Sequence, residues 1–280
     1  MPRARAAGIL VVDDDRLARH LSRSVLSKAG YRVRVARDGL DAVRLLRTAR
    51  YDVMLLDVWM PRMDGLAVLD WMKRLKHAPK VILVTSDDTP DTLLKAIHRR
   101  ADHVVCKPIE SPALLELVAD VIKAGRQPPI EVLSARPEWV ELLVPCTREA
   151  ADRLHTFMSH LDADLPEDVR ESVGYAFREL LLNAVEWGGR LNPKRRVRIS
   201  YLRARRMLLY RITDPGPGFS MEGLDHAAIS HPDDPIEHTI VREQKGLRPG
   251  GFGILMVRAK VDELIYNEAR NEVVFVKYLD

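Results

Sequence analysis

Short apolar runs alternate with amphipathic segments over the first 125 residues of the chain. The runs have the length of buried strands, and the segments between them repeat apolar residues every three or four positions, as helices do. We expect strands at Ile9–Val12, Tyr31–Ala36, Val53–Leu56, Val81–Val84 and Val104–Cys106, and helices at Leu17–Ala29, Leu40–Ala49, Leu66–Leu75, Thr92–Arg100 and Pro112–Ala124. These β–α repeats predict an α/β fold with a doubly wound, five-stranded parallel sheet.

The pattern changes after residue 124, where Gly125-Arg126-Gln127-Pro128-Pro129 ends the helix and marks a domain boundary. We therefore expect one domain at residues 1–125, a linker with a short strand at 126–137, and a second domain at 138–280. The elements expected in the second domain are a strand at Trp139–Val144, helices at Arg148–Leu161 and Asp168–Glu186, a hairpin of strands at Arg196–Arg203 and Met207–Thr213, a helix at Ile254–Val261, and closing strands at 262–267 and 271–279. This order predicts an α/β sandwich.

The composition is that of a globular protein long enough for two domains, with 280 residues, 46% hydrophobic and 30% charged. No apolar run approaches the ~20 residues of a membrane span, and no signal-peptide pattern opens the chain. We therefore expect a cytoplasmic protein that does not act on a membrane. The two cysteines, Cys106 and Cys146, lie in different halves and are expected to be reduced thiols.

Positive charge is concentrated in the first half. Residues 1–125 hold 22 Lys and Arg against 16 Asp and Glu, a net charge of +6, so residues 126–280 carry −2 of the chain's total of +4. This balance argues against direct nucleic-acid binding as the main function. The basic run Lys194–Arg206 could form a polyanion patch, but it alternates Val197, Ile199 and Tyr201 with polar residues, and we interpret it as a half-buried strand.

Polar residues stand where the predicted strands of the first half end. They are Asp13, Asp14, Asp15, Asp57, Thr85, Ser86 and Lys107. The carboxyl ends of strands in a doubly wound sheet meet at one edge, where ligands bind. Clustered carboxylates repel one another and need a cation, and oxygen ligands suit Mg²⁺. A helix N-cap would also explain the three consecutive aspartates, but it does not explain the residues after the other strands.

These residues, together with the segment Leu55–Gly65, resemble response-regulator receiver domains over residues 9–125. The resemblance implies that Asp57 accepts a phosphoryl group from an upstream histidine kinase or phosphotransfer protein, and that the bond before Pro108 is cis. The Mg²⁺ ligands that it implies are Asp13, Asp14, Asp57 and the carbonyl of Trp59. The residues implied to contact the phosphoryl oxygens are Thr85 and Lys107.

One position departs from the receiver pattern. Val104, three residues before the lysine, stands where many receivers carry an aromatic residue that moves together with the hydroxyl residue. We therefore expect the signal to leave this domain by another route than the usual hydroxyl–aromatic relay.

Polar and glycine-rich motifs follow one another in a fixed order in the second half. Asn183 lies four residues after Glu179, so a carboxylate and an amide share one face of a predicted helix. A strand then runs into Asp214-Pro-Gly-Pro-Gly218, where an acceptor lies beside backbone that can approach a ligand. After a long polar loop, Gly250-Gly-Phe-Gly253 opens a helix, an arrangement typical of phosphate binding.

This ordered set resembles the ATP-binding fold of histidine kinases, gyrase, Hsp90 and MutL over about residues 138–280, and within it most closely the anti-sigma-factor serine kinases. The resemblance implies ATP and Mg²⁺ as cofactors, with Asn183 holding Mg²⁺ on the phosphates and Asp214 binding the adenine amine. It implies Glu179 as the general base that accepts the proton of an attacking serine hydroxyl group or of water, as in a protein kinase or an ATPase. The glycines implied to line the base and the phosphates are Gly216, Gly218, Gly250, Gly251 and Gly253.

The second half also departs from its relatives in two respects. Trp187 replaces a histidine found in many of them, and the loop Ser220–Arg248 is long for an anti-sigma kinase. Within that loop, Lys245 and Arg248 fit either phosphate contacts or ordinary surface charges.

A histidine-kinase architecture is not expected between the two domains. A dimerising hairpin with a phosphorylatable histidine needs two helices of about 20 residues, each ~30 Å long, and the joint is too short for them. His155 and His160 fall on a helix of the second domain and are interpreted as ordinary surface residues.

The sequence thus predicts a two-component response regulator whose state at Asp57 controls an ATP-binding output domain. The output is expected to phosphorylate a serine or threonine of an anti-anti-sigma-like protein, or to bind a sigma factor. A non-catalytic ATP-sensing module that sequesters a partner, and a histidine-kinase-like protein acting with a separate histidine carrier, are the alternatives. The sequence does not decide whether the chain forms a homodimer.

Overall fold

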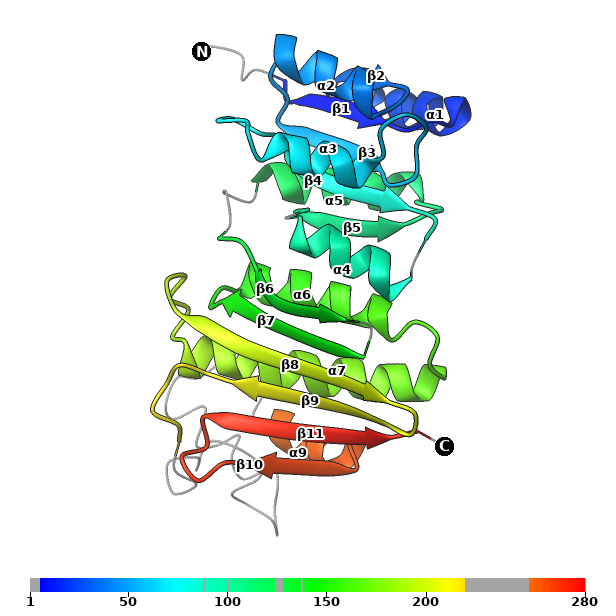
Figure 1. The fold of residues 1–280 in the computed structure, drawn as a ribbon. Coiled ribbons are helices and arrows are strands. Elements are labelled where there is room, and N and C mark those ends of the chain that lie inside the picture. Colours follow the sequence, from blue (N-terminus) through cyan, green and yellow to red (C-terminus); the bar gives the residue numbers. More distant parts are fainter. Residues whose placement is uncertain are drawn as a thin grey trace. The chain divides into compact units, whose positions relative to one another are not determined.

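The chain folds into two compact units, Met1–Gln127 and Pro128–Asp280. The computed structural model describes residues 6–87, 89–99, 101–123, 128–136, 138–219 and 252–279 (Figure 1). None of the helices within these ranges has the length and apolarity needed to cross a membrane.

The first unit is a parallel sheet between two layers of helices. Its elements are β1 (Gly8–Val12), α1 (Arg16–Lys28), β2 (Arg32–Ala36), α2 (Gly39–Thr48), β3 (Val53–Asp57), α3 (Gly65–Met72), β4 (Lys80–Thr85), α4 (Pro90–His98), β5 (His103–Cys106) and α5 (Ser111–Lys123). The strand order is β2-β1-β3-β4-β5, with every pair parallel. The predicted fold class is confirmed, and the predicted ends of the elements differ from the observed ends by a few residues only.

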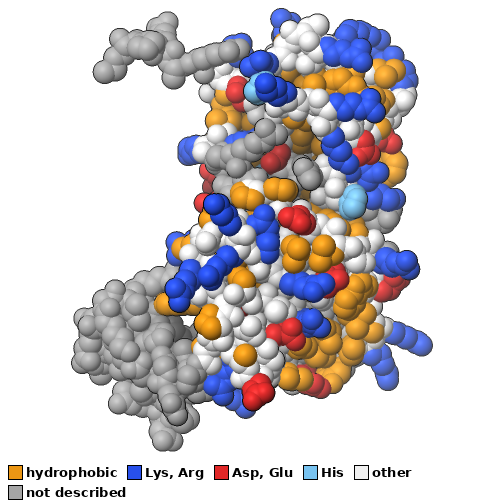
Figure 2. All heavy atoms as spheres, turned by 60° about the vertical axis from the view of Figure 1, so that its left-hand side comes forward, with side chains coloured by type: hydrophobic (Ala, Val, Ile, Leu, Met, Phe, Trp, Pro, Cys, Tyr) orange, Lys and Arg blue, Asp and Glu red, His pale blue; other side chains and the backbone are white. Residues whose placement is uncertain are grey.

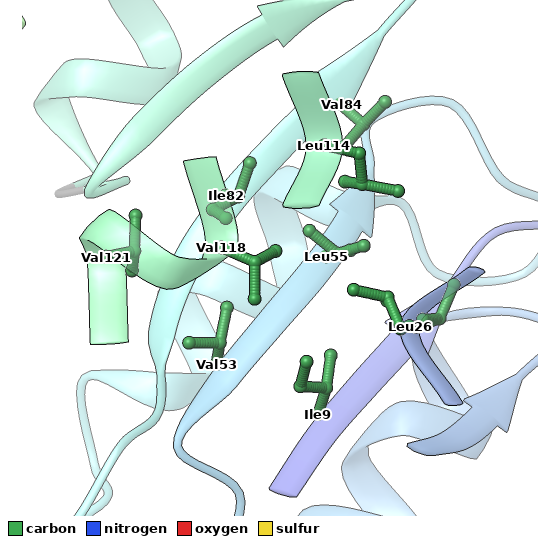
Figure 3. Packing of buried hydrophobic residues seen from close by; sticks show 10 residues of the cluster. Ile9, Leu26, Val53, Leu55, Ile82, Val84, Leu114, Val118 and Val121 are labelled. Atoms are coloured by element: carbon green, nitrogen blue, oxygen red, sulfur yellow. The ribbon is translucent and has the colours of Figure 1, made fainter. Parts of the chain in front are cut away.

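The continuous apolar runs become central strands because both faces of the sheet are covered. Ile9, Val53 and Ile82 are fully buried, and Val118 and Leu26 pack on them from α5 and α1 (Figure 3). The interior positions of β1, β3 and β4 are apolar, and the parallel pairing places the polar residues that end or follow β1, β3, β4 and β5 at one edge of this sheet.

The second unit is an antiparallel sheet with helices on one face. Its elements are β6 (Glu131–Arg136), β7 (Trp139–Pro145), α6 (Arg148–Leu161), α7 (Glu167–Asn183), the π-helical turn η1 (Ala184–Gly188), β8 (Arg196–Ala204), β9 (Met207–Thr213), α9 (Gly253–Lys260), β10 (Glu263–Tyr266) and β11 (Glu272–Tyr278). The strand order is β10-β11-β9-β8-β7-β6. Residues 126–137, expected as a linker, include β6, which pairs with β7 as the edge strand of this sheet.

Aromatic side chains join the sheet to the helices. Tyr210 on β9 is fully buried and stacks on Phe275 of β11, with ring centroids 4.8 Å apart, and it contacts Phe177 of α7 at 5.1 Å. Asp162, at the end of α6, accepts hydrogen bonds from the hydroxyl groups of Tyr210 and Tyr201. A carboxylate that is 4% exposed thus ties α6 to β8 and β9.

The basic run is a strand, as predicted. In β8, Val197, Ile199 and Tyr201 are buried. Its arginines are ion-paired within the unit: Arg196 with Glu131, Arg198 with Glu141 and Arg203 with Asp164. The three arginines within β8 are thus compensated by carboxylates of the same unit. In Figure 2, Lys and Arg side chains are interspersed with acidic and hydrophobic ones.

Candidate functional site

The first site lies at the carboxyl ends of β1, β3 and β5. Lys107 Nζ donates hydrogen bonds to Asp13 Oδ2 and to Asp57 Oδ2, each at 2.9 Å. Asp13 and Asp57 are both 6% exposed. Burial raises the pKa of Asp57, and the hydrogen bond from Lys107 opposes that shift. Burial lowers the pKa of Lys107, but its hydrogen bonds to both aspartates reverse the effect and the net shift is upward. The lysine thus compensates two carboxylates that are otherwise shielded from water.

The three consecutive aspartates after β1 have different structural roles. Asp15 caps α1, because its side chain accepts a hydrogen bond from the backbone N–H of Leu17 at 2.8 Å. Asp13 and Asp14 instead have carboxylate oxygens within 4.8 Å of one another and of an oxygen of Asp57. Carboxylate oxygens are the donors that Mg²⁺ prefers, so this cluster fits the ion that the sequence predicts. The N-cap interpretation therefore holds for Asp15 alone.

Thr85 ends β4 at the same edge but is held by the loop that follows it. Its hydroxyl accepts a hydrogen bond from the backbone N–H of Asp87 at 3.0 Å, and the side chain is fully buried. The carboxylate of Asp87 accepts hydrogen bonds from the hydroxyl group of Thr92 at 2.8 Å and from the indole of Trp59 at 3.2 Å. Asp87 thus links the segment after β3 to the segment after β4, a role that the sequence pattern did not reveal.

The peptide bond between Lys107 and Pro108 is cis, as predicted. Val104 is 8% exposed and belongs to the core of the unit, so the position of the missing aromatic is filled by a packed aliphatic side chain. The prediction that Trp59 supplies a carbonyl ligand stays a prediction.

The second site lies between α7, the end of β9 and the start of α9 (Figure 1). Glu179 and Asn183 are one turn apart on α7, with Tyr175 one turn before them. Burial raises the pKa of Tyr175, and the negative charge of Glu179 adds to that shift. A Cβ atom on Gly253, the first residue of α9, would overlap the carboxylate of Glu179. The carboxylate therefore packs directly against the N-terminal end of α9, where the helix dipole favours a negative charge.

The sequence predicts a helix that continues to Glu186. In the structure, the helix that carries Glu179 does not keep its regular α form that far. It changes at Ala184 into the π-helical turn η1, in which the N–H of Gly189 donates to the carbonyl of Ala184 at 2.8 Å. Such wide turns are frequent at functional sites. Here the turn brings Gly188 so close to Asp214 that a Cβ atom on Gly188 would overlap the carboxylate of Asp214.

Asp214 is oriented by the loop that it begins. Its Oδ1 accepts a hydrogen bond from the N–H of Gly216 at 2.7 Å, and its own N–H donates to the carbonyl of Asn271 at 2.8 Å. Burial raises the pKa of Asp214, and the hydrogen bond from Gly216 opposes the shift. A half-buried carboxylate beside close glycine backbone is an acceptor for an amino group such as that of adenine.

The turn between β10 and β11 holds this loop from the other side. The side-chain amide of Asn271 donates to the carbonyl of Gly216 at 3.1 Å, so one residue binds the loop through both its backbone and its side chain. Gly218 has φ +85°, and a Cβ atom there would overlap the carbonyl of Ala269. Sequence reasoning identified the glycines but not Asn271, because an asparagine in a turn carries no signal for a long-range contact.

Part of the predicted phosphate-binding segment lies outside the described residues. This concerns Gly250 and Gly251 and the candidate contacts Lys245 and Arg248. In the described part of the site, Gly253 lies against Glu179, Gly188 and Gly216 lie against Asp214, and Gly218 lies against Ala269. Asn183 lies one helical turn after Glu179 on α7. Neither Cys106 nor Cys146, both within the described residues, forms a disulfide bond.

Comparisons with known proteins agree with the two units. Residues 9–119 match the response regulator receiver domain, and residues 144–277 match the histidine kinase-like ATPase domain. The DNA-binding response regulator MtrA of Mycobacterium leprae is 31% identical over 183 residues, which are 65% of this chain and 80% of that protein. This chain belongs to the response regulators. Its match to the ATPase domain supports ATP binding by the second unit.

Other relatives of this response regulator match it over only part of their own length. The response regulator MprA of Mycobacterium avium is 33% identical over 142 residues, 50% of this chain, and the chain spans 62% of that relative. Among solved structures, the Vibrio cholerae chemotaxis protein CheY4 is 29% identical, with a TM-score of 0.40, and the match covers 41% of this chain and 98% of that one. A receiver domain implies a histidine kinase or another phosphodonor upstream.

Proposed function

We propose that this response regulator is an ATP-dependent protein kinase of the serine/threonine type whose activity is set by phosphorylation of Asp57. The partner that best fits the resemblance to anti-sigma kinases is an anti-anti-sigma-like protein, with a sigma factor bound in the alternative state. The observation that carries this proposal is the position of Glu179: a carboxylate one turn before Asn183, packed against the first residue of α9.

The proposed reaction needs one proton acceptor and one binding site for ATP. Asp214 accepts a hydrogen bond from the adenine amino group, and Asn183 with the glycine backbone at Gly253 faces the phosphates. Glu179 accepts the proton of the attacking hydroxyl group as that oxygen bonds to the γ-phosphorus atom, the bond to the bridging oxygen breaks, and ADP leaves. Bound Mg²⁺ would offset the negative charge of the phosphates, with Asn183 as its protein ligand.

In the first unit, Asp57 is the proposed acceptor of a phosphoryl group. Lys107 lies within hydrogen-bonding distance of the carboxylate and would pair with a phosphoryl oxygen after transfer. Asp13 and Asp14 would hold Mg²⁺ together with Asp57. Because Lys107 also binds Asp13, a phosphoryl group on Asp57 would redistribute the charges of three side chains at once, which is the proposed start of the signal.

Replacing Glu179 by glutamine will lower phosphoryl transfer at least about 100-fold, since the amide cannot accept the proton, while ATP binding is retained. The measurement is transfer of label from γ-labelled ATP to purified anti-anti-sigma-like proteins of the same organism, with ATP affinity determined in parallel. Glu171→Gln, two turns earlier on α7, is the matched control and should transfer normally. If wild type binds ATP but labels no partner, while retaining one in a pull-down, the non-catalytic ATP-sensing module is the correct function.

The state of Asp57 is expected to change the rate of that transfer. Loading the full chain with beryllofluoride, or phosphorylating it with acetyl phosphate, should shift the labelling rate in wild type and leave it unchanged in Asp57→Ala. Equal rates and equal ATP affinities with and without the modification would rule out control by the receiver. Label appearing on Asp57 from ATP alone would instead indicate a histidine-kinase-like activity.

A further inference from the structure

A buried cysteine lies at the same edge of the second sheet as Asp214. Cys146 directly follows β7, and Asp214 directly follows β9. Both strands pair antiparallel with β8, so they run in the same direction and end at the same edge. The pairing continues one residue beyond β7, since the N–H of Cys146 donates to the carbonyl of Arg195 at 3.1 Å. The sheet therefore fixes the backbone from which the thiol projects.

The dipeptide Gly188–Gly189 lies between the side chains of Cys146 and Asp214. A Cβ atom on Gly188 would overlap the carboxylate of Asp214, and a Cβ atom on Gly189 would overlap the sulfur atom of Cys146. The backbone of the dipeptide thus packs directly against Asp214 through one residue and against Cys146 through the next. Gly216, whose N–H binds Asp214, lies there as well, because its Cβ atom would be 2.9 Å from Cα of Gly188.

The contact between Cys146 and Gly189 is closed to water. Cys146 is 0% exposed, and Gly189 is buried. The dipeptide is also held along its backbone: the N–H of Gly189 donates to the carbonyl of Ala184 at 2.8 Å, and the guanidinium of Arg195 donates to the carbonyl of Gly188 at 3.3 Å. Because a close-packed interior transmits a change in side-chain volume, a larger residue at position 146 would press the dipeptide towards Asp214.

Cys146 acts on this contact through its volume and not through a charge. Burial raises the pKa of the thiol; Arg196 and Arg195 oppose this shift, and the negative charge of Asp214 adds to it. The net shift is upward, so the thiol is neutral at physiological pH and is a poor nucleophile.

We propose that Cys146 is a positioning residue of the ATP site. By packing against Gly189 it sets how closely Gly188 approaches Asp214, and thus where the carboxylate lies that accepts from the adenine amino group. This inference rests on the proposed role of Asp214. It follows that the size of residue 146 controls how strongly the site prefers a purine with an amino group over the same purine without one. A residue that only fills the core would affect the binding of both nucleotides equally.

The test compares ATP with purine riboside 5′-triphosphate, which carries a hydrogen atom in place of the amino group. Isothermal titration calorimetry of the full chain with Mg²⁺ measures both affinities. Wild type should bind ATP at least about 10-fold more tightly, the factor that one hydrogen bond to a charged acceptor provides. Cys146→Val enlarges the side chain beside Gly189. It should lower the affinity for ATP about 10-fold and leave that for the second nucleotide within about 2-fold of wild type.

Two further variants control for size and for general packing. Cys146→Ser keeps the size of the side chain and should retain the preference of wild type. Val140→Ile enlarges another buried side chain, 1% exposed and near the opposite end of β7, and should leave the ratio of the two affinities unchanged. Equal losses for both nucleotides in Cys146→Val overturn the inference, and so does an unchanged preference in that variant or an equal change of preference in Val140→Ile.

Asp214→Ala separates this inference from the proposed function. If Asp214→Ala removes the preference while Cys146→Val retains it, only the inference about Cys146 fails. If wild type shows no preference, or Asp214→Ala keeps it, the proposed role of Asp214 fails and the inference fails with it. If Cys146→Val binds neither nucleotide, Cys146→Ala replaces it: the smaller side chain withdraws support from Gly189 and should reduce the preference about 3-fold, with the same contrary outcomes.

Discussion

Replacing Gly188 by alanine should lower the affinity for ATP by about 1,000-fold, or about 4 kcal/mol. The added methyl group would occupy the space of the Asp214 carboxylate, which Gly188 touches across the site. Asp214 would have to move, and its movement would break the 2.7 Å hydrogen bond from Gly216. The loss follows because the half-buried carboxylate that we propose as the acceptor for the adenine amino group would then be misplaced.

Isothermal titration calorimetry of the full chain with ATP measures this loss of affinity. Gly174→Ala, on α7, is the matched control: the nearest atom to its added Cβ would be Nε2 of His155 at 3.7 Å, an ordinary contact, and ATP affinity should not change. Combining Gly188→Ala with Asp214→Ala isolates the overlap. If Gly188→Ala lowers the ATP affinity of the Asp214→Ala chain by the same factor as it lowers that of wild type, the contact with Asp214 is not the cause.

Replacing Asp162 by alanine should lower the free energy of unfolding of the second unit by about 4 kcal/mol. The carboxylate accepts hydrogen bonds from the hydroxyl groups of two buried tyrosines, from Tyr201 at 2.9 Å and from Tyr210 at 2.5 Å. Alanine would leave both hydroxyl groups without their acceptor in a site that excludes water. Asp164→Ala is the control: this carboxylate is 68% exposed, and the loss of its ion pair with Arg203 should cost at most about 1 kcal/mol.

Replacing Asp162 by asparagine should have a much smaller effect that depends on pH. Burial raises the pKa of Asp162, although the hydrogen bonds from the tyrosines oppose the shift. The folded chain therefore holds this proton more tightly than the unfolded chain, whose aspartate titrates near about 3.9. The resulting stability is fully present below that pH and is lost as the pH rises through the raised pKa. Asparagine does not titrate, so the variant should gain stability relative to wild type from about pH 4 towards neutrality.

Differential scanning calorimetry can assign these effects to the second unit, because ATP shifts only the transition of the unit that binds it. A difference between wild type and Asp162→Asn that is constant over this pH range would show that the pKa of Asp162 is not raised in the folded chain. A loss in Asp162→Ala no larger than in Asp164→Ala would show that the tyrosines find other acceptors.

The first site could be predicted almost completely from the sequence. Each of its side chains follows a strand directly, and a parallel sheet necessarily brings the ends of neighbouring strands together. Asp13, Asp57 and Lys107 therefore meet as predicted. Asp87 was not predicted as a link, because the loop after β4 has no periodic pattern and its contact with Trp59 spans two separate loops.

The sequence predicted the motifs of the second site but not the structural features that hold these motifs in place. The spacing of Glu179 and Asn183 follows from helical geometry, and the glycines stand out by their residue type. The change from an α-helix to a π-helical turn at Ala184 was not predicted, because one wider turn leaves the apolar pattern unaltered. Gly188 lies beyond the predicted helix Asp168–Glu186 and was not predicted as a site residue, but in the structure it contacts Asp214.

The sequence by itself determined the order of the elements, both fold types and the residues that carry the proposed chemistry. Local periodicity and the chain order of polar residues are sufficient for this, because parallel strands and helical turns impose their geometry on neighbours in sequence. Only the tertiary structure decided that β6 belongs to the second sheet, that Asp162 accepts from two tyrosines, and that one face of that sheet lacks helices in the described residues. These features depend on which distant segments pack together, and packing of that kind leaves no periodic trace in the chain.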